Sequence, residues 1–329
     1  MNVVEDIMIM GSDQPLSSVI RDERLLLGQP HSMKVPVKAW EDDLLTVVHF
    51  PPEFFERPYA PPLGVYENTE MRIEWQQMEG RQPFYHRNCD VDEISYQIAG
   101  ERTLMTELGV IEHRTGELSV IPRGVAHDNW GRRESHLLLY VPAPLTTVIE
   151  PVRVSERVMP PFPGWEPSNL NECVTECMGT LGHDKATFPI DERQLLDHVE
   201  IDDRRIGVLV APPEPGGVWA YTSERVRVGM VNTAPGLGRR YRRTLDADEI
   251  QYQISGRRTL ISQRGIVELE PGDFVRIPLG VAYASVSHEP SRYLTLLSHL
   301  ALPQIKETAR TADLYSPERL ATLTTEVNA

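Results

Sequence analysis

Short apolar runs, interrupted every few positions by polar residues, follow one another along this chain. Each run has about five to eight residues and is bounded by Gly, Pro, Asn or Asp, a spacing typical of β-strands joined by turns. The clearest runs are residues 44–50, 71–78, 93–100, 117–122 and 136–142. The pattern predicts an all-β fold, a barrel or a sandwich, with a few short helices.

The run EISYQIAG at 93–100 alternates without interruption. Successive side chains of a strand point to opposite faces of the sheet, so Glu93, Ser95 and Gln97 share one face. The alternate apolar side chains share the other face. If the strands close into a barrel, we expect the polar face to line its lumen.

An internal repeat divides the chain. A shift of 156 residues aligns 92–127 with 248–283 without a gap, and 18 of the 36 positions are identical. Three residues ahead of this block recur at the same offset: Tyr85 as Tyr241, Arg87 as Arg243 and Asp90 as Asp246. The repeat predicts two copies of one β domain, which we place at 1–155 and 156–329.

The segments outside the repeat have weaker patterns. Residues 1–44 show little periodicity, and we expect them to wrap the first domain or an oligomer partner. Residues 142–200 predict a proline-rich connector with one short helix, which Asp191 would cap. Near the C-terminus, SPERLATLTTEV predicts a helix with Ser316 as its cap and Pro317 at its first position.

The composition is acidic, with a formal net charge of −15. This charge argues against nucleic acid or an anionic membrane as a partner. No apolar run approaches the length of about 18 residues that a membrane span needs. The N-terminus lacks the pattern of a secretory signal, and three cysteines make no disulfide framework, so we expect a cytoplasmic protein. Cys173 and Cys177, with His183 nearby, are a weak zinc signal because a fourth ligand is missing.

A spaced motif lies within the first copy. Pro122, Gly124 and His127 are arranged P-x-G-x-x-H, six residues after Gly116, and Glu93 lies seven residues before the glycine of EISYQIAG. These positions match the two motifs of the cupin family, and the chain resembles that family. The resemblance implies two tandem cupin barrels, each a double-stranded β-helix or jelly roll.

His86, Glu93 and His127 are the potential metal ligands of this motif region. Two imidazoles and one carboxylate form the ligand set of non-haem Fe(II) sites that keep open coordination positions. We predict that these residues bind Fe(II) and carry catalysis, with Mn, Ni or Zn as alternative metals. The competing interpretation is that three polar residues line a barrel and hydrogen-bond to one another without a metal.

The second copy has lost part of this set. Arg242 and Tyr283 replace the two histidines, and only the glutamate recurs, as Glu249. Because arginine does not lose its proton to bind a metal, we expect the second domain to be metal-free. Glu249 would then pair with Arg242 or Arg243. The glycines and the proline of the motif survive without the histidines, which indicates that the histidines are dispensable for folding.

The sequence around the candidate ligands also resembles ring-cleaving dioxygenases. Cupins with the fuller motif carry H-x-H before the glutamate, whereas this chain has H-x-N, with Asn88 at the third position. In this it is similar to the 3-hydroxyanthranilate dioxygenases. The segments 86–100 and 106–124 resemble homogentisate dioxygenases. Both families hold iron with two histidines and one glutamate, and the resemblance implies the same set here.

Further residues are candidates for positions around the metal or the substrate. Arginine can hold a substrate carboxylate through two hydrogen bonds, although its more usual place is the solvated surface. A tyrosine could line the pocket, and an asparagine could bind the metal weakly or hold a water. A glutamine on the strand face of Glu93 could support that ligand. The candidates are Arg81, Arg87, Arg123, Tyr85, Asn88 and Gln97.

Together these features predict an Fe(II)-dependent, extradiol-type dioxygenase. It would use O2 to open the ring of a substituted hydroxy-aromatic acid resembling homogentisate, gentisate or hydroxyanthranilate. One alternative is a metal-dependent isomerase, lyase or non-aromatic oxygenase at the same site. Another is a metal-free protein that binds small molecules. Cupins often pair through edge strands, so the resemblance also implies a homodimer.

Overall fold

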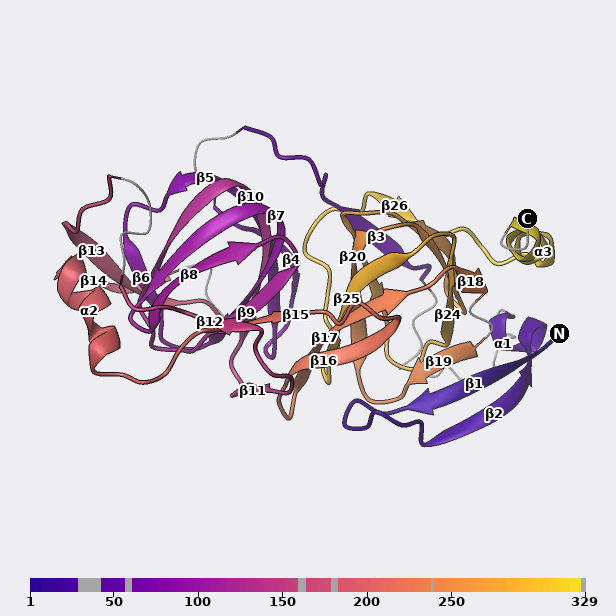
Figure 1. Cartoon of the computed structure of the whole chain (residues 1–329). Coiled ribbons are helices and arrows are strands. Elements are labelled where there is room, and N and C mark those ends of the chain that lie inside the picture. Colours follow the sequence, from indigo (N-terminus) through magenta and orange to yellow (C-terminus); the bar gives the residue numbers. More distant parts are fainter. Residues whose placement is uncertain (29–42, 57–60, 159–163, 179–182, 238–239, 327–329) are drawn as a thin grey trace. The chain divides into compact units, whose positions relative to one another are not determined.

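The structure is a computed structural model of the chain. It describes residues 1–28, 43–56, 61–158, 164–178, 183–237 and 240–326. Within these residues strands predominate and three α-helices occur, which confirms the predicted all-β class. The strands of each of two compact units curl into a barrel (Figure 1), so the expected two tandem β-barrels are confirmed as well.

The two units do not follow the predicted domain ranges. The N-terminal barrel consists of Pro52–Ala211 and Ala220–Ser223. The C-terminal barrel consists of Met1–Pro51, Pro212–Trp219 and Glu224–Ala329. The predicted ranges 1–155 and 156–329 are therefore wrong at both ends of the first domain, because the first segment of the chain belongs to the second barrel and the connector belongs to the first.

Two long strands, β7 (Asp92–Thr106) and β10 (His127–Val141), lie next to each other at the centre of the N-terminal sheet. Its hydrogen-bonded strands run in the order β12-β15-β9-β7-β10-β6-β13-β14, with β5 also on β10, β4 on β5 and β8 on β7. Helix α2 (Glu192–Asp197) and a 3-10 turn, η1 (His198–Glu200), follow β14. The strands are β4 (Leu63–Glu67), β5 (Arg72–Arg81), β6 (Tyr85–Asn88), β7 (Asp92–Thr106), β8 (Gly109–Arg114), β9 (Glu117–Ile121), β10 (His127–Val141), β11 (Thr146–Thr147), β12 (Arg153–Val154), β13 (Asn169–Glu176), β14 (His183–Asp191) and β15 (Gly207–Val210).

The C-terminal barrel is built from two sheets. One has the order β2-β1-β19-β24-β21-β22 with β18 on β24, and the other contains β17-β25-β20-β23-β3-β26. Its helices are α1 (Glu23–Leu27) and α3 (Pro317–Glu326), and β16 (Gly216–Thr222) has residues in both units. The strands are β1 (Asn2–Met8), β2 (Ser17–Asp22), β3 (Thr46–His49), β17 (Val226–Thr233), β18 (Gly236–Leu237), β19 (Arg240–Thr244), β20 (Asp248–Ser255), β21 (Arg258–Ser262), β22 (Gly265–Leu269), β23 (Asp273–Ile277), β24 (Tyr283–Ser287), β25 (Ser291–Ser298) and β26 (Arg310–Thr311).

The N-terminal segment completes the C-terminal barrel. Strand β1 runs parallel to β19, with Val4 opposite Arg240 and Met8 opposite Thr244. Val3 is buried in one apolar cluster with residues of β19, β21 and β24. The expectation that residues 1–44 wrap the first domain is therefore wrong for the described residues 1–28. Because their periodicity is weak, the sequence did not predict β1, a strand that is stabilised by pairing with β19 far along the chain.

A tight turn places the start of β10 beside β6. Gly124 adopts a left-handed backbone with φ of 81°, a region that a residue with a Cβ rarely enters. The Gly124 N–H donates to the Asn88 carbonyl at 2.8 Å, and the Val125 N–H donates to the Pro122 carbonyl at 3.1 Å. The turn thus fixes the chain two residues before His127. Gly280, with φ of 76°, makes the same turn in the second copy.

The predicted helix caps are observed. The Asp191 carboxylate accepts hydrogen bonds from the backbone N–H groups of Arg193 at 3.0 Å and Gln194 at 3.4 Å. Ser316 Oγ accepts from the Arg319 N–H at 3.1 Å, with Pro317 as the first residue of α3. Both caps satisfy N–H groups that the first turn of a helix leaves without a partner.

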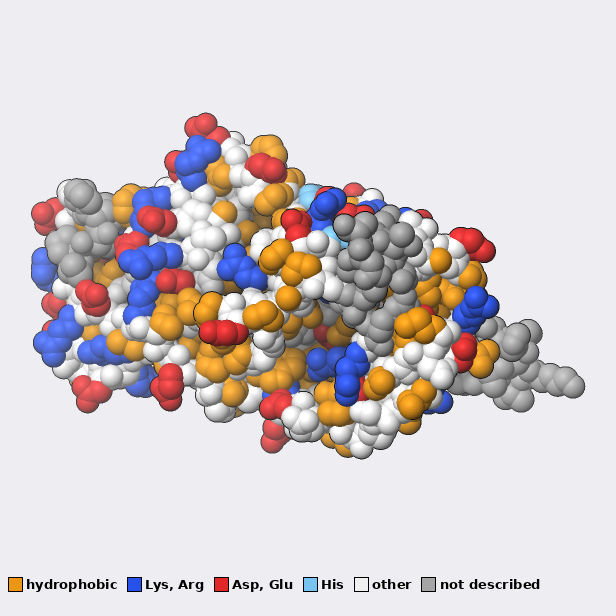
Figure 2. Space-filling model, turned by 45° about the vertical axis from the view of Figure 1, so that its right-hand side comes forward, with side chains coloured by type: hydrophobic (Ala, Val, Ile, Leu, Met, Phe, Trp, Pro, Cys, Tyr) orange, Lys and Arg blue, Asp and Glu red, His pale blue; other side chains and the backbone are white. Residues whose placement is uncertain are grey.

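Acidic and basic side chains are interspersed on one face of the molecule. On the face drawn in Figure 2, acidic and basic groups alternate and are not gathered into a patch of one sign. Within the described part of the chain, no helix combines the length and the apolar character needed to cross a bilayer.

Candidate metal centre

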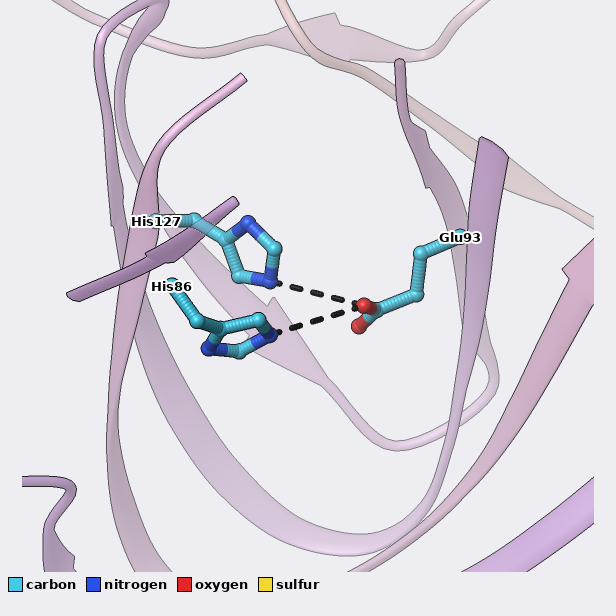
Figure 3. Close-up of side chains that lie close together, drawn as sticks. All are labelled: His86, Glu93 and His127. Carbon is cyan, nitrogen blue, oxygen red and sulfur yellow. Dashed lines mark ion pairs between the residues drawn. The ribbon is translucent and has the colours of Figure 1, made fainter. Parts of the chain in front are cut away.

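Three strands of the N-terminal barrel bring the predicted ligands together. His86 lies on β6, Glu93 on β7 and His127 on β10, and His86 and His127 are direct cross-strand partners. Glu93 Oε2 lies 3.4 Å from His127 Nε2 and 3.7 Å from His86 Nε2. The three potential donor atoms all lie within 4.8 Å of one another. Figure 3 shows the two imidazoles and the carboxylate pointing at a common point.

The His127 ring has a defined protonation pattern. Its Nδ1 lies 3.1 Å from the Val125 carbonyl, which can only accept, so Nδ1 carries the proton. Nε2 is the ring nitrogen that faces Glu93, and this buried atom has no hydrogen-bond partner among the described residues. When Nε2 is unprotonated, its lone pair faces a carboxylate oxygen, which is unfavourable unless a cation lies between them. The arrangement fits a metal ion.

His86 is held from its other side. The side-chain amide of Gln82 contacts His86 Nδ1 at 2.7 Å and also donates to the Phe84 carbonyl at 2.9 Å. The contact to Nδ1 fixes the ring so that Nε2 faces Glu93. Because the Gln82 amide nitrogen donates to Nδ1, a neutral His86 carries its proton on Nε2, and this proton has to leave Nε2 when a metal binds there.

The electrostatics keep one imidazole neutral and the carboxylate ionised. Burial lowers the pKa of His86, and the neighbouring His127 lowers it further, although Glu93 opposes this shift. Burial alone would raise the pKa of Glu93, but the two histidines outweigh it and hold that pKa well below its usual range. At neutral pH the site therefore offers a neutral His86 and an ionised Glu93.

Asn88 positions Glu93. Its Nδ2 donates to Glu93 Oε2 at 2.7 Å, since an ionised carboxylate can only accept. Its Oδ1 accepts from the Cys177 thiol at 3.1 Å. Burial raises the pKa of Cys177, so the thiol keeps the proton that it donates. With both ends of the amide engaged, the contacts of Asn88 are those of a support for Glu93.

A cavity of about 340 Å³ lies beside the triad. The β-pleat places every second residue of β5 and β10 on its wall. The cross-strand pairs on this wall are Arg72 with Tyr140, Glu74 with Leu138, and Gln76 with His136. His86, Glu93, Asn88 and Phe84 also line the cavity, which thus combines two of the three candidate ligands with other polar and aromatic groups.

The arginine in the cavity wall is Arg72, which was missed from the sequence. Arg72 Nη2 lies 2.5 Å from Glu74 Oε1, and burial raises the pKa of Glu74. The signal was present in the run MRIEWQQM, where Arg72, Glu74 and Gln76 occupy alternate positions. That alternation marks one polar strand face, as it does around Glu93.

The arginines nearest in sequence lie elsewhere. None of Arg81, Arg87 and Arg123 lines the cavity. Arg81 pairs with Asp128 at 2.7 Å and also with Glu192. Arg87 pairs with Glu172 at 2.6 Å and Glu107 at 3.0 Å, while the Arg123 guanidinium donates to the Pro142 carbonyl at 2.6 Å. Their charges are engaged by the fold, so a substrate in this cavity does not meet them.

Tyr85 and Gln97 also serve the barrel. Tyr85 is fully buried, and its hydroxyl donates to Glu192 Oε1 at 2.9 Å. Gln97 Nε2 donates to Glu134 Oε2 at 3.0 Å and to the Ala99 carbonyl at 2.9 Å. Neither lines the cavity, and Gln97 supports Glu134 in place of Glu93.

The corresponding place in the C-terminal barrel is filled by protein donors. The Tyr283 hydroxyl donates to Glu249 Oε2 at 2.8 Å, while Thr295 Oγ1 at 2.8 Å and Gln251 Nε2 at 2.7 Å donate to Oε1. Arg243 pairs with Glu5 instead. The expected Glu249–Arg243 pair is therefore wrong, and among the described contacts the carboxylate is satisfied by hydroxyl and amide groups.

A second cluster of potential ligands lies in the C-terminal barrel at His49, Glu270 and Asp273. His49 Nδ1 lies 2.8 Å from Asp273 Oδ1, and Arg310 Nη1 donates to the same oxygen at 3.0 Å. A guanidinium at the carboxylate already supplies the positive charge that a metal would bring. This cluster is an ion-pair network.

No family model and no curated protein matches the chain. Among solved structures, it is similar to a cupin 2 conserved barrel domain protein from Leptotrichia buccalis, with 8% identity and a TM-score of 0.48 over 78% of this chain and 97% of that chain. It is also similar to a deletion mutant of Bacillus subtilis oxalate decarboxylase, with 13% identity and a TM-score of 0.43 over 84% of this chain and 88% of that chain. The likeness concerns the fold.

Proposed function

We propose that the N-terminal barrel binds one divalent metal ion through His86, Glu93 and His127. The observation that supports this most directly is the buried, unpartnered Nε2 of His127, which faces Glu93 Oε2 at 3.4 Å. Two neutral imidazoles and one carboxylate leave a divalent ion with one net positive charge and with open positions. The donor set favours Fe(II); Mn, Ni and Zn are the alternatives.

We propose further that the protein is a ring-cleaving dioxygenase acting on a hydroxy-aromatic acid. Bound Fe(II) would supply a site where a substrate hydroxyl and O2 meet. The cavity of about 340 Å³ is near the lower end of known small-molecule pockets, which suits a substrate with a single ring. Phe84, Leu138 and Tyr140 offer apolar and aromatic surface to such a ring.

Arg72 is the group in this cavity that can receive the substrate carboxylate. In the structure it is paired with Glu74, whose pKa is raised by burial. When Glu74 is protonated, it no longer neutralises the charge of the Arg72 guanidinium. The carboxylate of an acid substrate can then pair with Arg72 without a second negative charge being buried. In this proposal Arg72 orients the ring while the opposite end of the substrate lies at the metal ligands.

The test is metal analysis followed by oxygen uptake. The purified chain would be loaded with Fe(II) without oxygen and assayed with gentisate, homogentisate, hydroquinone and aminophenol-type substrates. We expect one metal per chain and O2 consumption with a hydroxy-aromatic acid. Arg72→Gln should raise KM for the acid much more than for hydroquinone, which lacks the carboxylate.

Two other outcomes would replace this proposal. A chain that is folded but retains no metal would be a metal-free binding protein. A chain that retains metal but consumes no O2 with any of these compounds would belong with the isomerases, lyases or non-aromatic oxygenases. His86→Ala with full metal content and activity would show that the site itself is wrongly assigned.

A further inference from the structure

A buried histidine–carboxylate pair lies at the same cavity of the N-terminal barrel. His136 lines the cavity, and its Nδ1 is 3.4 Å from Glu134 Oε2. Both residues are on β10, two positions apart, and both are almost fully buried. Neither belongs to the metal triad, and Glu134 Oε1 and His136 Nδ1 are both buried without a hydrogen-bond partner among the described residues.

The surroundings of Glu134 keep it ionised. Burial alone would raise its pKa, but His136 and Arg102 outweigh burial and hold that pKa below its usual range. Gln97 Nε2 donates to Oε2 at 3.0 Å, and Arg102 Nε lies 3.6 Å from the same oxygen. An ionised carboxylate beside Nδ1 favours the tautomer that carries its proton there. Nε2 is then the basic nitrogen available to a ligand in the cavity.

The groups next to the pair do not compete with His136 as a base that faces the cavity. Burial and the neighbouring Arg102 hold the pKa of His113 well below its usual range, so that imidazole stays neutral. Arg102 remains cationic and contacts His113 Nδ1 at 3.2 Å. On the adjacent strand the residue opposite His136 is Gln76, which has no charge.

The C-terminal barrel shows the same frame without the pair. By strand register, Tyr293 takes the place of His136, because each is opposite the equivalent glutamine, Gln253 or Gln97. Arg258, the repeat partner of Arg102, hydrogen-bonds to Gln253 and Gln251 at 2.6 Å each. The barrel can therefore accommodate its buried arginine without a histidine or a glutamate, so folding does not explain why the N-terminal barrel has both.

We propose that Glu134 and His136 form an acid–base pair that takes the proton of a substrate hydroxyl as the substrate binds. This role rests on the proposed function. The substrate O–H bond breaks, an N–H bond forms at His136 Nε2, and the oxygen keeps the electron pair. The resulting imidazolium is stabilised by Glu134. No oxidant or reductant is involved in this step.

The test measures how many protons are released to the buffer when a hydroxy-aromatic probe binds. Zn(II) would be used in place of Fe(II), because it has no redox chemistry and allows binding to be measured without turnover. Binding of 4-nitrocatechol would be followed by calorimetry in two buffers of different ionisation enthalpy, and by the absorption change that accompanies its ionisation. In wild type His136 keeps the proton. The His136→Gln variant should therefore release about one proton more to the buffer.

Two further variants make the result decisive. Glu134→Gln keeps the imidazole but removes the charge that stabilises its protonated form, so its proton release should move toward that of His136→Gln. Tyr293→Phe changes the equivalent position of the C-terminal barrel and should leave the proton count as in wild type. Metal content is measured for each variant and should stay at one per chain.

Failure of this inference differs from failure of the proposed function. Equal proton release by wild type, His136→Gln and Glu134→Gln, with the probe bound and ionised in all three, would overturn the acid–base pair alone. Failure of the Zn(II)-loaded wild type to bind the probe would overturn the hydroxy-aromatic function and this role with it.

Discussion

The equivalent glutamates of the two barrels, Glu93 and Glu249, have different partners. In the N-terminal barrel, Glu93 faces two imidazole nitrogens, one of which is buried without a hydrogen-bond partner among the described residues. In the C-terminal barrel, Glu249 accepts three hydrogen bonds from side chains of its own barrel. A buried carboxylate needs compensation in either case. Protein donors supply it in one barrel, and the other is arranged for a cation.

The contrast extends along the lumen. The row Arg72–Tyr140–Glu93 corresponds by register to Arg227–Leu297–Glu249, and the row Gln76–His136–Gln97 corresponds to Val231–Tyr293–Gln253. The strand frame is therefore shared, and three of these six inward positions differ: Tyr140, Gln76 and His136 correspond to Leu297, Val231 and Tyr293. Chemistry in this fold is set by a few lumen positions, and the turns and pleat that hold them are common to both copies.

Removal of a ligand should have the largest effect. His127→Ala deletes one of three donors, so metal affinity should fall by more than about 100-fold and activity with it. The matched change in the other barrel, Tyr283→Phe, removes one hydrogen bond from Glu249 and should leave metal content unchanged. Metal analysis after dialysis compares the two variants. Equal loss in both would mean that the barrels do not differ as described.

Removal of the support for Glu93 should have an intermediate effect. Asn88→Ala deletes the donor to Oε2, and metal affinity should fall by about 10- to 100-fold while the ligands remain. The aligned Thr244→Ala is the control, because the Thr244 hydroxyl is buried without a partner among the described residues. Competition with a chelator measures both. Complete loss of metal in Asn88→Ala would instead identify Asn88 as a ligand.

Installing histidines in the C-terminal barrel should give only weak binding. The double change Arg242→His and Tyr283→His, made in the His127→Ala background, would create a two-histidine, one-glutamate set. Thr295 and Gln251 still occupy Glu249 Oε1, so the affinity should be at least about 10-fold below that of the natural site. Calorimetric titration measures it. Full affinity would show that these donors do not matter.

The smallest expected effect is a change in the pH dependence of stability. The pKa of His113 is well below 6.5 in the folded metal-free chain, whereas the unfolded chain binds a proton near 6.5. Stability from this residue is thus complete above about pH 6.5 and is lost as the pH falls below it, by up to about 1.4 kcal/mol per pH unit. His113→Leu, which copies Leu269 of the other barrel, should remove that slope.

Urea unfolding at several pH values between about 7 and 5 gives the comparison. Burial raises the pKa of Asp128 to about 7, which contributes a slope of the opposite sign in the same range. The difference between variant and wild type isolates His113, because Asp128 is present in both. Parallel pH profiles for the two proteins would contradict the expected shift.

Most of the fold could be predicted from the sequence, and so could the convergence of His86, Glu93 and His127. Alternation along 93–100 reported a strand face, and the repeat reported two domains. A comparison of the two copies also distinguished the residues that the turns need from the residues that can change. These signals are local in sequence, so they need no knowledge of which strands pair.

The features that were not predicted from the sequence depend on contacts between residues far apart in the chain. Strand β1 has no local signal for its pairing with β19, because the two are more than 230 residues apart. Arg81 and Arg87 are close to the ligands in sequence, but their ion pairs with Glu192 and Glu172 come from the later connector. Arg72 enters the cavity through the register of β5 against β10. Contacts of this range depend on topology, which sequence proximity does not report.

The parallel pairing of β1 with β19 has a consequence for biosynthesis. Because translation proceeds from the N-terminus, Pro52–Ala211 can leave the ribosome and fold as one nearly continuous piece. Strand β1 emerges first, yet its partner at Arg240–Thr244 is made only after that piece is complete. The hairpin of β1 and β2 can form early, but the edge of β1 that pairs with β19 must remain without its partner until then.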